Sequence, residues 1–261
     1  MARAPDPVAP GHIALAQKLA DAAGAIVRRY FRTPVKVDDK PDLTPVTIAD
    51  RETERAMRAL IAEAFPTHGV IGEEEGRERA DAEFVWVLDP IDGTKNFISG
   101  IPMFGTLIAL VRAGRPVLGV IDQPVLGERW LGAAGQATTL NGKPVRTRAC
   151  ADLANATLYA TSPDMFSGAD AAPFARLRAR VKLARYGADC YAYAQLASGF
   201  IDLVVECDLK VYDFAALVPV IEGAGGAIAD WQGRALDLGS GGRVIACGDP
   251  QLLDSARAAL V

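Results

Sequence analysis

The chain has 261 residues, of which 50% are hydrophobic and 23% charged, and its formal net charge is −4 at pH 7. This length can bury a sizeable core in one large or two small domains, and the acidic balance argues against a nucleic acid or an anionic membrane as a partner. No apolar run approaches the roughly 18 residues of a membrane span. The four cysteines form no C-x-x-C pair, which is typical of reduced cysteines in a cytoplasmic protein. With only His12 and His68, the chain cannot build a His-rich metal cage.

The first 90 or so residues predict helices followed by buried strands. Apolar residues recur with a helical period, and Thr47 or Asp50 can cap the second helix. The segment between the two helices, residues 33–47, is polar and extended. In chain order the predicted elements are helices over 11–31 and 47–65 and strands over 70–72 and 84–88.

The rest of the chain predicts an antiparallel meander and then alternating strands and helices. Turn signals such as Asn141-Gly142 separate the strands of the meander. The predicted strands are 106–112, 116–123, 129–132, 138–140, 158–162, 201–206, 227–231 and 243–247, and the predicted helices are 171–179, 189–198, 213–222 and a last one from Pro250. This order favours an α/β (α+β) fold of layered sheets and helices. We expect a single unit over 1–261 with two tightly packed halves, about 1–150 and 151–261.

Carboxylates follow two of the predicted strands directly. The strand 84–88 opens onto the turn Asp89-Pro-Ile-Asp92-Gly-Thr94, and the strand 70–72 opens onto Glu73. Unpaired buried carboxylates are costly, so this turn requires a counter-charge, which a divalent cation can supply. The alternatives are a solvated turn with aspartate as a turn-former and a solvated loop of glutamates. If the two strands are neighbours, Glu73 lies beside the Asp89–Asp92 turn.

The acids at the ends of elements suit magnesium chemistry. They are Glu73, Asp89, Asp92 and Asp213, the last of which opens a helix. Mg²⁺ prefers oxygen ligands and binds through a few carboxylates, waters and substrate phosphate. Gly93 and Thr94 can begin a helical turn whose backbone N–H groups face a phosphate.

Metal-assisted attack of water on a phosphate monoester follows from this set of groups. Aspartyl-phosphate phosphatases place their two acids as D-x-D at the end of a strand. The spacing here is Asp89-x-x-Asp92, so direct hydrolysis without a covalent intermediate is favoured.

The same segments resemble the inositol monophosphatase family. The resemblance extends over nearly the whole chain in the family's order, through Gly72-Glu73-Glu74, Trp86–Thr94, Thr47–Asp50, Val211–Ala216 and Gly223–Gly226. It implies a layered α/β/α/β/α sandwich of the inositol monophosphatase and fructose-1,6-bisphosphatase type. It also implies dependence on Mg²⁺, with two or three ions per active site and Mn²⁺ as an alternative, together with lithium sensitivity and a homodimer.

The resemblance implies a role for each acid of the set. Glu73, Asp89 and the carbonyl of Ile91 would hold one metal. Asp89, Asp92 and Asp213 would surround the second.

The resemblance also implies roles around the attacking water. Thr94 and Glu73 would orient or deprotonate it. Asp50 would support Thr94 and, with Glu73, would bound a looser third metal site. Lys40 would lie on a mobile loop near the site, although a solvated lysine explains it equally well.

The second half of the chain points to the substrate. The segments Arg185–Tyr193 and Val205–Asp213 resemble the histidinol-phosphate phosphatase branch of the family. Histidinol carries an ammonium and an imidazole, so its pocket should offer acceptors, which Asp189 and Glu206 can supply. Arg185 would bind phosphate, in its own or a neighbouring subunit, or orient Asp189, or form a surface ion pair. The substrate-binding set is then Asp92, Gly93, Thr94, Arg185, Asp189, Glu206 and Asp213.

We therefore expect a Mg²⁺-dependent phosphomonoesterase that hydrolyses L-histidinol phosphate by direct attack of a metal-activated water. The alternative substrate is inositol 1-phosphate or a related sugar phosphate, whose hydroxyls carboxylates can also bind. An alternative of another class is a non-catalytic interaction protein on the same fold. The intact set of acids argues against that alternative.

Overall fold

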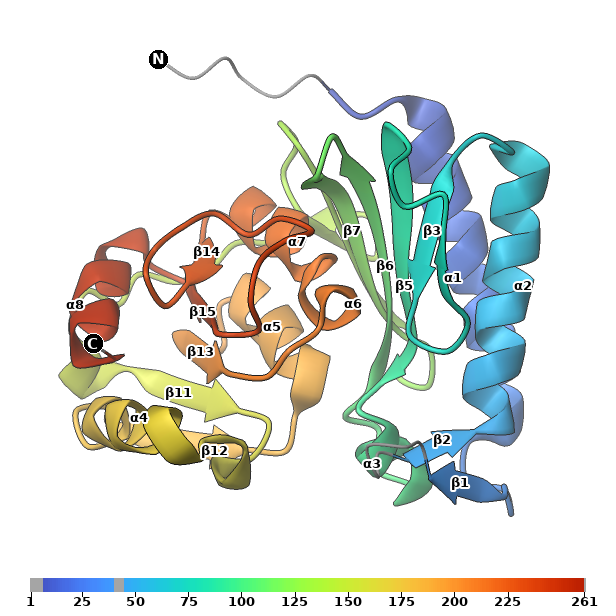
Figure 1. Ribbon diagram of the computed structural model, residues 1–261. Coiled ribbons are helices and arrows are strands. Elements are labelled where there is room, and N and C mark those ends of the chain that lie inside the picture. The colour runs from blue at the N-terminus through green and yellow to red at the C-terminus, as the bar shows by residue number, and fades with distance from the viewer. Residues whose placement is uncertain (1–6, 40–44, 261) are drawn as a thin grey trace.

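The computed structural model describes residues 7–39 and 45–260, and its helices and strands form five layers (Figure 1). Two helices cover the outer face of a large sheet, three short helices lie between this sheet and a smaller one, and two helices cover the far face. The layers' helices are α1 (Pro10–Tyr30) and α2 (Ile48–Ala64), then α5 (Asp189–Ala197), α6 (Val211–Phe214) and α7 (Leu217–Gly223), then α4 (Ala171–Arg178) and α8 (Pro250–Leu260). The expected α/β/α/β/α sandwich is confirmed.

The large sheet has eight strands in the order β10-β9-β8-β7-β6-β5-β3-β4. Its members are β3 (Gly69–Gly72), β4 (Gly76–Glu78), β5 (Phe84–Asp92), β6 (Gly105–Arg112), β7 (Arg115–Gln123), β8 (Glu128–Ala133), β9 (Thr139–Leu140) and β10 (Lys143–Pro144). The short helix α3 (Thr94–Ile98) joins β5 to β6. Strands β6 to β9 form the expected antiparallel meander, which β5 extends by pairing antiparallel with β6, whereas β3 pairs with β5 in parallel.

The small sheet has five strands in the order β12-β11-β13-β15-β14. They are β11 (Thr157–Ala160), β12 (Leu183–Tyr186), β13 (Leu203–Glu206), β14 (Ala227–Asp230) and β15 (Val244–Cys247). A two-stranded ribbon, β1 (Val37–Asp39) with β2 (Pro45–Thr47), lies near α3 in Figure 1. Among the described residues, no helix combines the length and apolar character that a membrane span requires.

Strand β5 is apolar throughout because both of its faces are buried. Trp86 and Leu88 pack with α1 and α2, while Val85 and Val87 point to the layer of helices between the sheets. A strand that is covered on both faces has a continuous apolar run rather than an alternating one. A third apolar cluster, which includes Phe174 of α4, fills the space behind the small sheet.

A glycine on β7 brings the chain after α6 directly onto the large sheet. A Cβ added at Gly119 would lie 1.9 Å from the carbonyl oxygen of Ala216, so only glycine permits this approach. The contact holds the α6–α7 segment, which carries Asp213, against the sheet that carries Asp89 and Asp92.

Several elements differ from those that the sequence predicted. The helix predicted over 213–222 is two helices, α6 and α7. The reason is Pro219, which has no backbone N–H to donate and whose ring clashes with the carbonyl four residues earlier. Strand β5 continues to Asp92 because Asp89 and Asp92 still pair with β6, across a register shift. The strands β4 and β12 were not predicted, since edge strands with exposed polar residues lack an apolar pattern.

Both histidines belong to one aromatic cluster beside α1. The indole N–H of Trp86 donates to Nδ1 of His68 over 3.2 Å, and the His68 ring stacks on Phe65 and lies 5.3 Å from His12. Burial lowers the pKa of both imidazoles, and repulsion from His12 lowers the pKa of His68 further, against a small opposing effect of Glu83. Only a neutral His68 can accept the Trp86 hydrogen bond at Nδ1.

We expect this cluster to make the fold sensitive to mild acid. Because the folded pKa values lie below the unfolded value of about 6.5, the unfolded state binds more protons as pH falls, and stability is lost from about pH 6.5 downward. His68→Gln keeps an acceptor for Trp86 but does not titrate. Its melting temperature should fall less than that of the wild type between pH 7 and pH 5, while the difference between the two proteins should be constant from pH 7 to 9. Parallel curves down to pH 5 would contradict this role.

Candidate active site

The parallel pairing of β3 and β5 brings Glu73 to the end of β5. Gly72 is the register partner of Leu88, and the backbone N–H of Glu73 donates to the Leu88 carbonyl over 3.2 Å. The Glu73 carboxylate faces Asp89, and its charge contributes to the raised pKa of that acid. The structure therefore brings together the two acids that the sequence placed at neighbouring strand ends.

The turn after β5 is fixed by its own polar groups. The N–H of Ile91 donates to Oδ1 of Asp89 over 3.0 Å, and the hydroxyl of Thr94 donates to the Ile91 carbonyl over 3.0 Å. Gly93 has φ of 87°, the left-handed region that favours glycine, and a Cβ there would lie 3.2 Å from Cβ and Cγ of Asp189. The turn thus lies directly against Asp189.

Asp213 reaches this turn from over a hundred residues later in the chain. It lies in α6, where the N–H of Lys210 donates to its Oδ2 over 2.6 Å. One carboxylate oxygen from each of Asp89, Asp92 and Asp213 lies within 4.8 Å of the others. We call these three residues the carboxylate triad.

The triad is a concentration of buried negative charge. Burial, and then repulsion from Glu73, Asp92 and Asp213, raises the pKa of Asp89 well above its ordinary value. Burial, and then repulsion from Asp189 and Asp213, does the same for Asp92, against hydrogen bonding from Cys190, whose N–H donates over 2.6 Å. Oxygen donors with uncompensated charge at this spacing fit a hard divalent cation.

The third acid of the triad, Asp213, is shifted in the same direction. Burial raises the pKa of Asp213 to about 7, and repulsion from Glu73 and Glu206 adds to it, although the Lys210 N–H and charge oppose the shift. The acids of β5 and α6 therefore share one electrostatic environment.

Two further carboxylates lie near the triad. Glu206, which is 3% exposed, accepts from the N–H of Thr161 over 2.9 Å and from the hydroxyl of Tyr193 over 3.0 Å. Asp189 accepts from the side-chain amide of Asn96. Burial raises the pKa of Glu206 to about 7 and that of Asp189 to about 6, against the effect of these hydrogen bonds.

Asp92 and Asp213 of the triad share a cavity of about 120 Å³ with Asp189 and Glu206. A small volume lined by four carboxylates can hold a cation and an ester whose other end is polar or charged. Its lining residues are Asp92, Thr161, Met165, Asp189, Cys190, Tyr193, Glu206, Leu209, Asp213 and Leu217.

Comparison with known proteins identifies the family to which this site belongs. The model of the inositol monophosphatase family matches residues 12–261. The chain belongs to the inositol monophosphatase family. Members act on small phosphate esters and are generally metal-dependent, so the chain is a phosphatase of this family, and its acidic cluster could bind a metal.

Two relatives and one solved structure are similar to the chain over most of its length. The chain is 55% identical over 223 residues to the chloroplastic bifunctional phosphatase IMPL2 of Arabidopsis thaliana, covering 85% of this chain and 64% of that protein's length. It is 38% identical over 222 residues to a histidinol-phosphatase of Chlorobaculum parvum, with coverage of 84% and 86%. An inositol monophosphatase from Zymomonas mobilis superposes with a TM-score of 0.89 at 49% identity, over 95% of this chain and 97% of that one.

Three residues to which the resemblance gave roles lie away from the triad or outside the described part. Asp50, 1% exposed, accepts from the N–H and hydroxyl of Thr47 in a capping box, and repulsion from Glu73 contributes to its pKa of about 6, which burial chiefly raises. Arg185 is exposed on β12 and does not line the cavity. Lys40 lies outside the described residues. The roles of all three remain predictions.

Sequence reasoning gave no role to three residues that complete the site. Tyr193 lines the cavity and donates to Glu206. Thr161 holds the same carboxylate from β11's C-terminal end. Asn96 contacts Asp189 across 93 positions of sequence, and its only signal was its place just after the family segment Trp86–Thr94.

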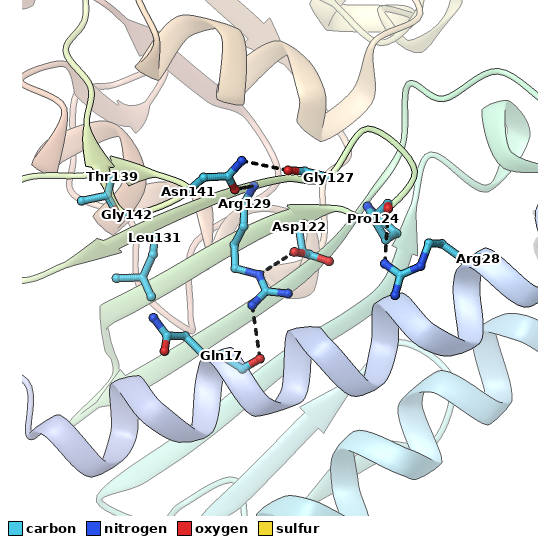
Figure 2. Close-up of a pocket in the computed structure, with 10 residues that line it drawn as sticks. All are labelled: Gln17, Arg28, Asp122, Pro124, Gly127, Arg129, Leu131, Thr139, Asn141 and Gly142. Carbon is cyan, nitrogen blue, oxygen red and sulfur yellow. Dashed lines mark hydrogen bonds and ion pairs between the residues drawn. The ribbon is translucent and has the colours of Figure 1, made fainter.

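A larger cavity of about 430 Å³ lies elsewhere, between α1 and the strands β7 to β9 (Figure 2). Its Arg129 guanidinium donates to Asp122 over 2.6 Å, contacts Asp21 at 2.9 Å and reaches the Gln17 carbonyl at 3.4 Å. The arginine's charge is therefore neutralised by the protein. This network ties α1 to the sheet and shares no residue with the cavity beside the triad.

We expect Asp213→Asn to increase the stability of the metal-free protein and to remove its response to divalent cations. The amide keeps an acceptor for Lys210 but removes one repelling charge from the triad. The metal-free melting temperature should rise by about 2–4 °C, the shift that about 1 kcal/mol produces in a chain of this size. Saturating Mg²⁺, which stabilises the wild type by about 2.7 kcal/mol at a hundred times Kd, should have little effect on the variant.

Asp254→Asn is the matched control, because the Asp254 side chain is 92% exposed. It should leave both melting temperatures unchanged. An Asp213→Asn protein that responds to Mg²⁺ as the wild type does would contradict a metal role for the triad.

Proposed function

We propose that the chain is a Mg²⁺-dependent phosphomonoesterase that hydrolyses L-histidinol phosphate to L-histidinol and phosphate. The observation that carries this proposal is the cavity lined by four carboxylates. Asp92 and Asp213 belong to the triad, whereas Asp189 and Glu206 lie beyond it and are available for the other end of the ester. The similarity to proteins named histidinol-phosphatase supports this substrate.

The metal ligands in this proposal are Glu73, Asp89, Asp92, Asp213 and the carbonyl of Ile91. Two or three Mg²⁺ ions would be held in this way, with Mn²⁺ as the alternative metal. A bound divalent cation supplies Lewis acidity toward the phosphate ester and toward water. The triad's mutual repulsion supports this assignment, because a cation relieves it.

Thr94 and Glu73 are the residues that we propose to orient the attacking water and accept its proton. The Thr94 hydroxyl already donates its hydrogen to Ile91, so its oxygen is left as an acceptor for water. Glu73 is only partly buried and is therefore open to solvent. Asp50 would support this pair through its neighbour Glu73, and the N–H groups of Gly93 and Thr94 would bind the phosphate oxygens.

Asp189 and Glu206 are the residues that we propose to recognise the alcohol. A protonated amine or imidazole would compensate their charge, which burial makes unfavourable. Inositol 1-phosphate or a related sugar phosphate is the second candidate, supported by the neighbour that is named an inositol monophosphatase. Its hydroxyls would hydrogen-bond to the same acids without neutralising them.

A homodimer is also part of the proposal. Arg185 and Leu183 are exposed on β12, which is an edge strand of the small sheet. An arginine in this position is available to a second subunit rather than to its own cavity, which supports the reading that it binds phosphate across an interface.

The substrate is tested by comparing two esters. The kcat/KM for L-histidinol phosphate should exceed that for inositol 1-phosphate by at least about tenfold, the ratio that about 1.4 kcal/mol of differential binding gives. Activity on both should require Mg²⁺ or Mn²⁺. A reversed preference would assign the chain to the inositol alternative, and no turnover of any small monoester would refute the enzyme proposal.

Glu206→Gln separates recognition of the alcohol from chemistry. The variant keeps an acceptor for Thr161 but loses the charge, so kcat/KM for L-histidinol phosphate should fall by about 10- to 100-fold, as expected for a lost charge-assisted contact. The kcat/KM for p-nitrophenyl phosphate, whose leaving group carries no positive charge, should change by less than about threefold. Glu63→Gln, an exposed acid on α2, is the control. Equal losses on both esters would give Glu206 a structural role.

A further inference from the structure

Asp189 has a backbone conformation that its surroundings have to maintain. Its φ is 45°, in the left-handed region that aspartate occupies infrequently, and it lies between the exposed Gly187 turn and α5. Its side chain rests on the Gly93 turn, where an added Cβ would lie 3.2 Å from Asp189 Cγ. A residue keeps such a backbone conformation only when contacts with its surroundings hold it there.

The side-chain amide of Asn96 is the group that joins these segments. Its Nδ2 has two hydrogens, which are shared among Oδ2 of Asp189, the Met103 carbonyl at 2.9 Å and the Gly187 carbonyl at 3.1 Å. The three acceptors come from the chain after α3, the turn before α5 and the Asp189 carboxylate itself. Because all three are acceptors, the nitrogen of the amide has to face them.

Asn96 is itself held by the packing of α3. Its neighbour Phe97 is 2% exposed and packs against Phe104 and Phe31 with ring centroids 5.2 and 5.8 Å apart. The backbone carbonyl of Asn96 also accepts a hydrogen bond from the N–H of Ile101 over 2.9 Å. The amide therefore projects from a rigid support, although Asn96 does not line the cavity.

Thr161 cannot replace Asn96 as the donor for Asp189. Its hydroxyl is within hydrogen-bonding reach of both Asp189 and Glu206, and it has only one hydrogen to donate. Loss of the Asn96 amide would draw this hydrogen toward Asp189 and away from Glu206. The orientation of both acids near the triad then depends on one amide.

We propose that Asn96 is a positioning residue that orients the Asp189 carboxylate and so determines the preference for phosphate esters of cationic alcohols. This inference rests on the proposed function, because it needs Asp189 to contact the alcohol. Asn96 does not touch the ester. It acts through Asp189, so its effect should be confined to esters whose alcohol carries a positive charge.

The test is a double-mutant cycle with two esters. Asn96→Ala should raise KM for L-histidinol phosphate by about tenfold or more, with kcat changed by less than about threefold, and should leave kcat/KM for glycerol 2-phosphate within about threefold. Asp189→Asn should show the same selectivity. Because Asn96 acts through Asp189, the kcat/KM of the double variant for L-histidinol phosphate should lie within about twofold of the value for Asp189→Asn alone.

A binding measurement provides a readout other than turnover. Calorimetric titration of L-histidinol into the wild type and Asn96→Ala should show the same loss of affinity as the KM values. Asn141→Ala is the matched control, because Asn141 also joins backbone groups of a turn, Gly127 and Arg129, away from the catalytic cavity. This variant should lower the melting temperature without changing the ratio of the kcat/KM values for the two esters.

The outcomes separate this inference from the proposed function. Additive losses in the double variant, or equal losses on both esters, would overturn the positioning role even if L-histidinol phosphate is the preferred substrate. A wild type without preference for the cationic ester would refute the proposed substrate. The cycle on whichever monoester is turned over would then test only the orientation of Asp189 by Asn96, which additivity would overturn and non-additivity would support.

Discussion

The mutual repulsion of three closely spaced carboxylates is the constraint on which the site depends. Asp89, Asp92 and Asp213 present oxygens within 4.8 Å of one another, and the pKa of each is raised by burial and by its acidic neighbours. A fold that holds such a set has to supply energy from elsewhere, and here the apolar layers on both faces of β5 do so. The arrangement is destabilising until a cation is present, which is the physical reason for a metal-dependent family to keep it.

Close packing between the layers brings these acids together and fixes their positions. The α6–α7 segment lies directly on β7 at Gly119, where no side chain would fit, so Asp213 arrives at the end of β5 in a fixed position. The two remaining acids of the cavity come from the other layers, Asp189 from the start of α5 and Glu206 from the end of β13. β5 thus contributes two acids and α5, α6 and β13 contribute one each, and the cavity is formed where these elements meet.

The triad and the second pair of acids have different chemical consequences. The triad explains why a phosphate ester is the expected substrate class, since a divalent cation and a phosphate are complementary. In the proposed function the second pair, Asp189 and Glu206, binds the alcohol. This pair is held by neutral donors, namely Thr161, Tyr193 and Asn96, rather than by an arginine within the cavity. Neutral donors orient the carboxylates without cancelling their charge, so the charge is left for the substrate.

The sequence by itself determined the chemistry. The apolar run of β5 ending in Asp89-Pro-Ile-Asp92-Gly-Thr94, Glu73 after the neighbouring strand, and the family segments predicted the layered fold and the acids, because covalent neighbours and strand periodicity are local properties. Only the tertiary structure showed that Pro219 divides a helix, that Arg185 lies away from its own cavity, and that Asn96, Thr161 and Tyr193 hold the second pair of acids. Those contacts join residues up to 93 positions apart, and their geometry depends on how helices pack between two sheets, which no local pattern encodes.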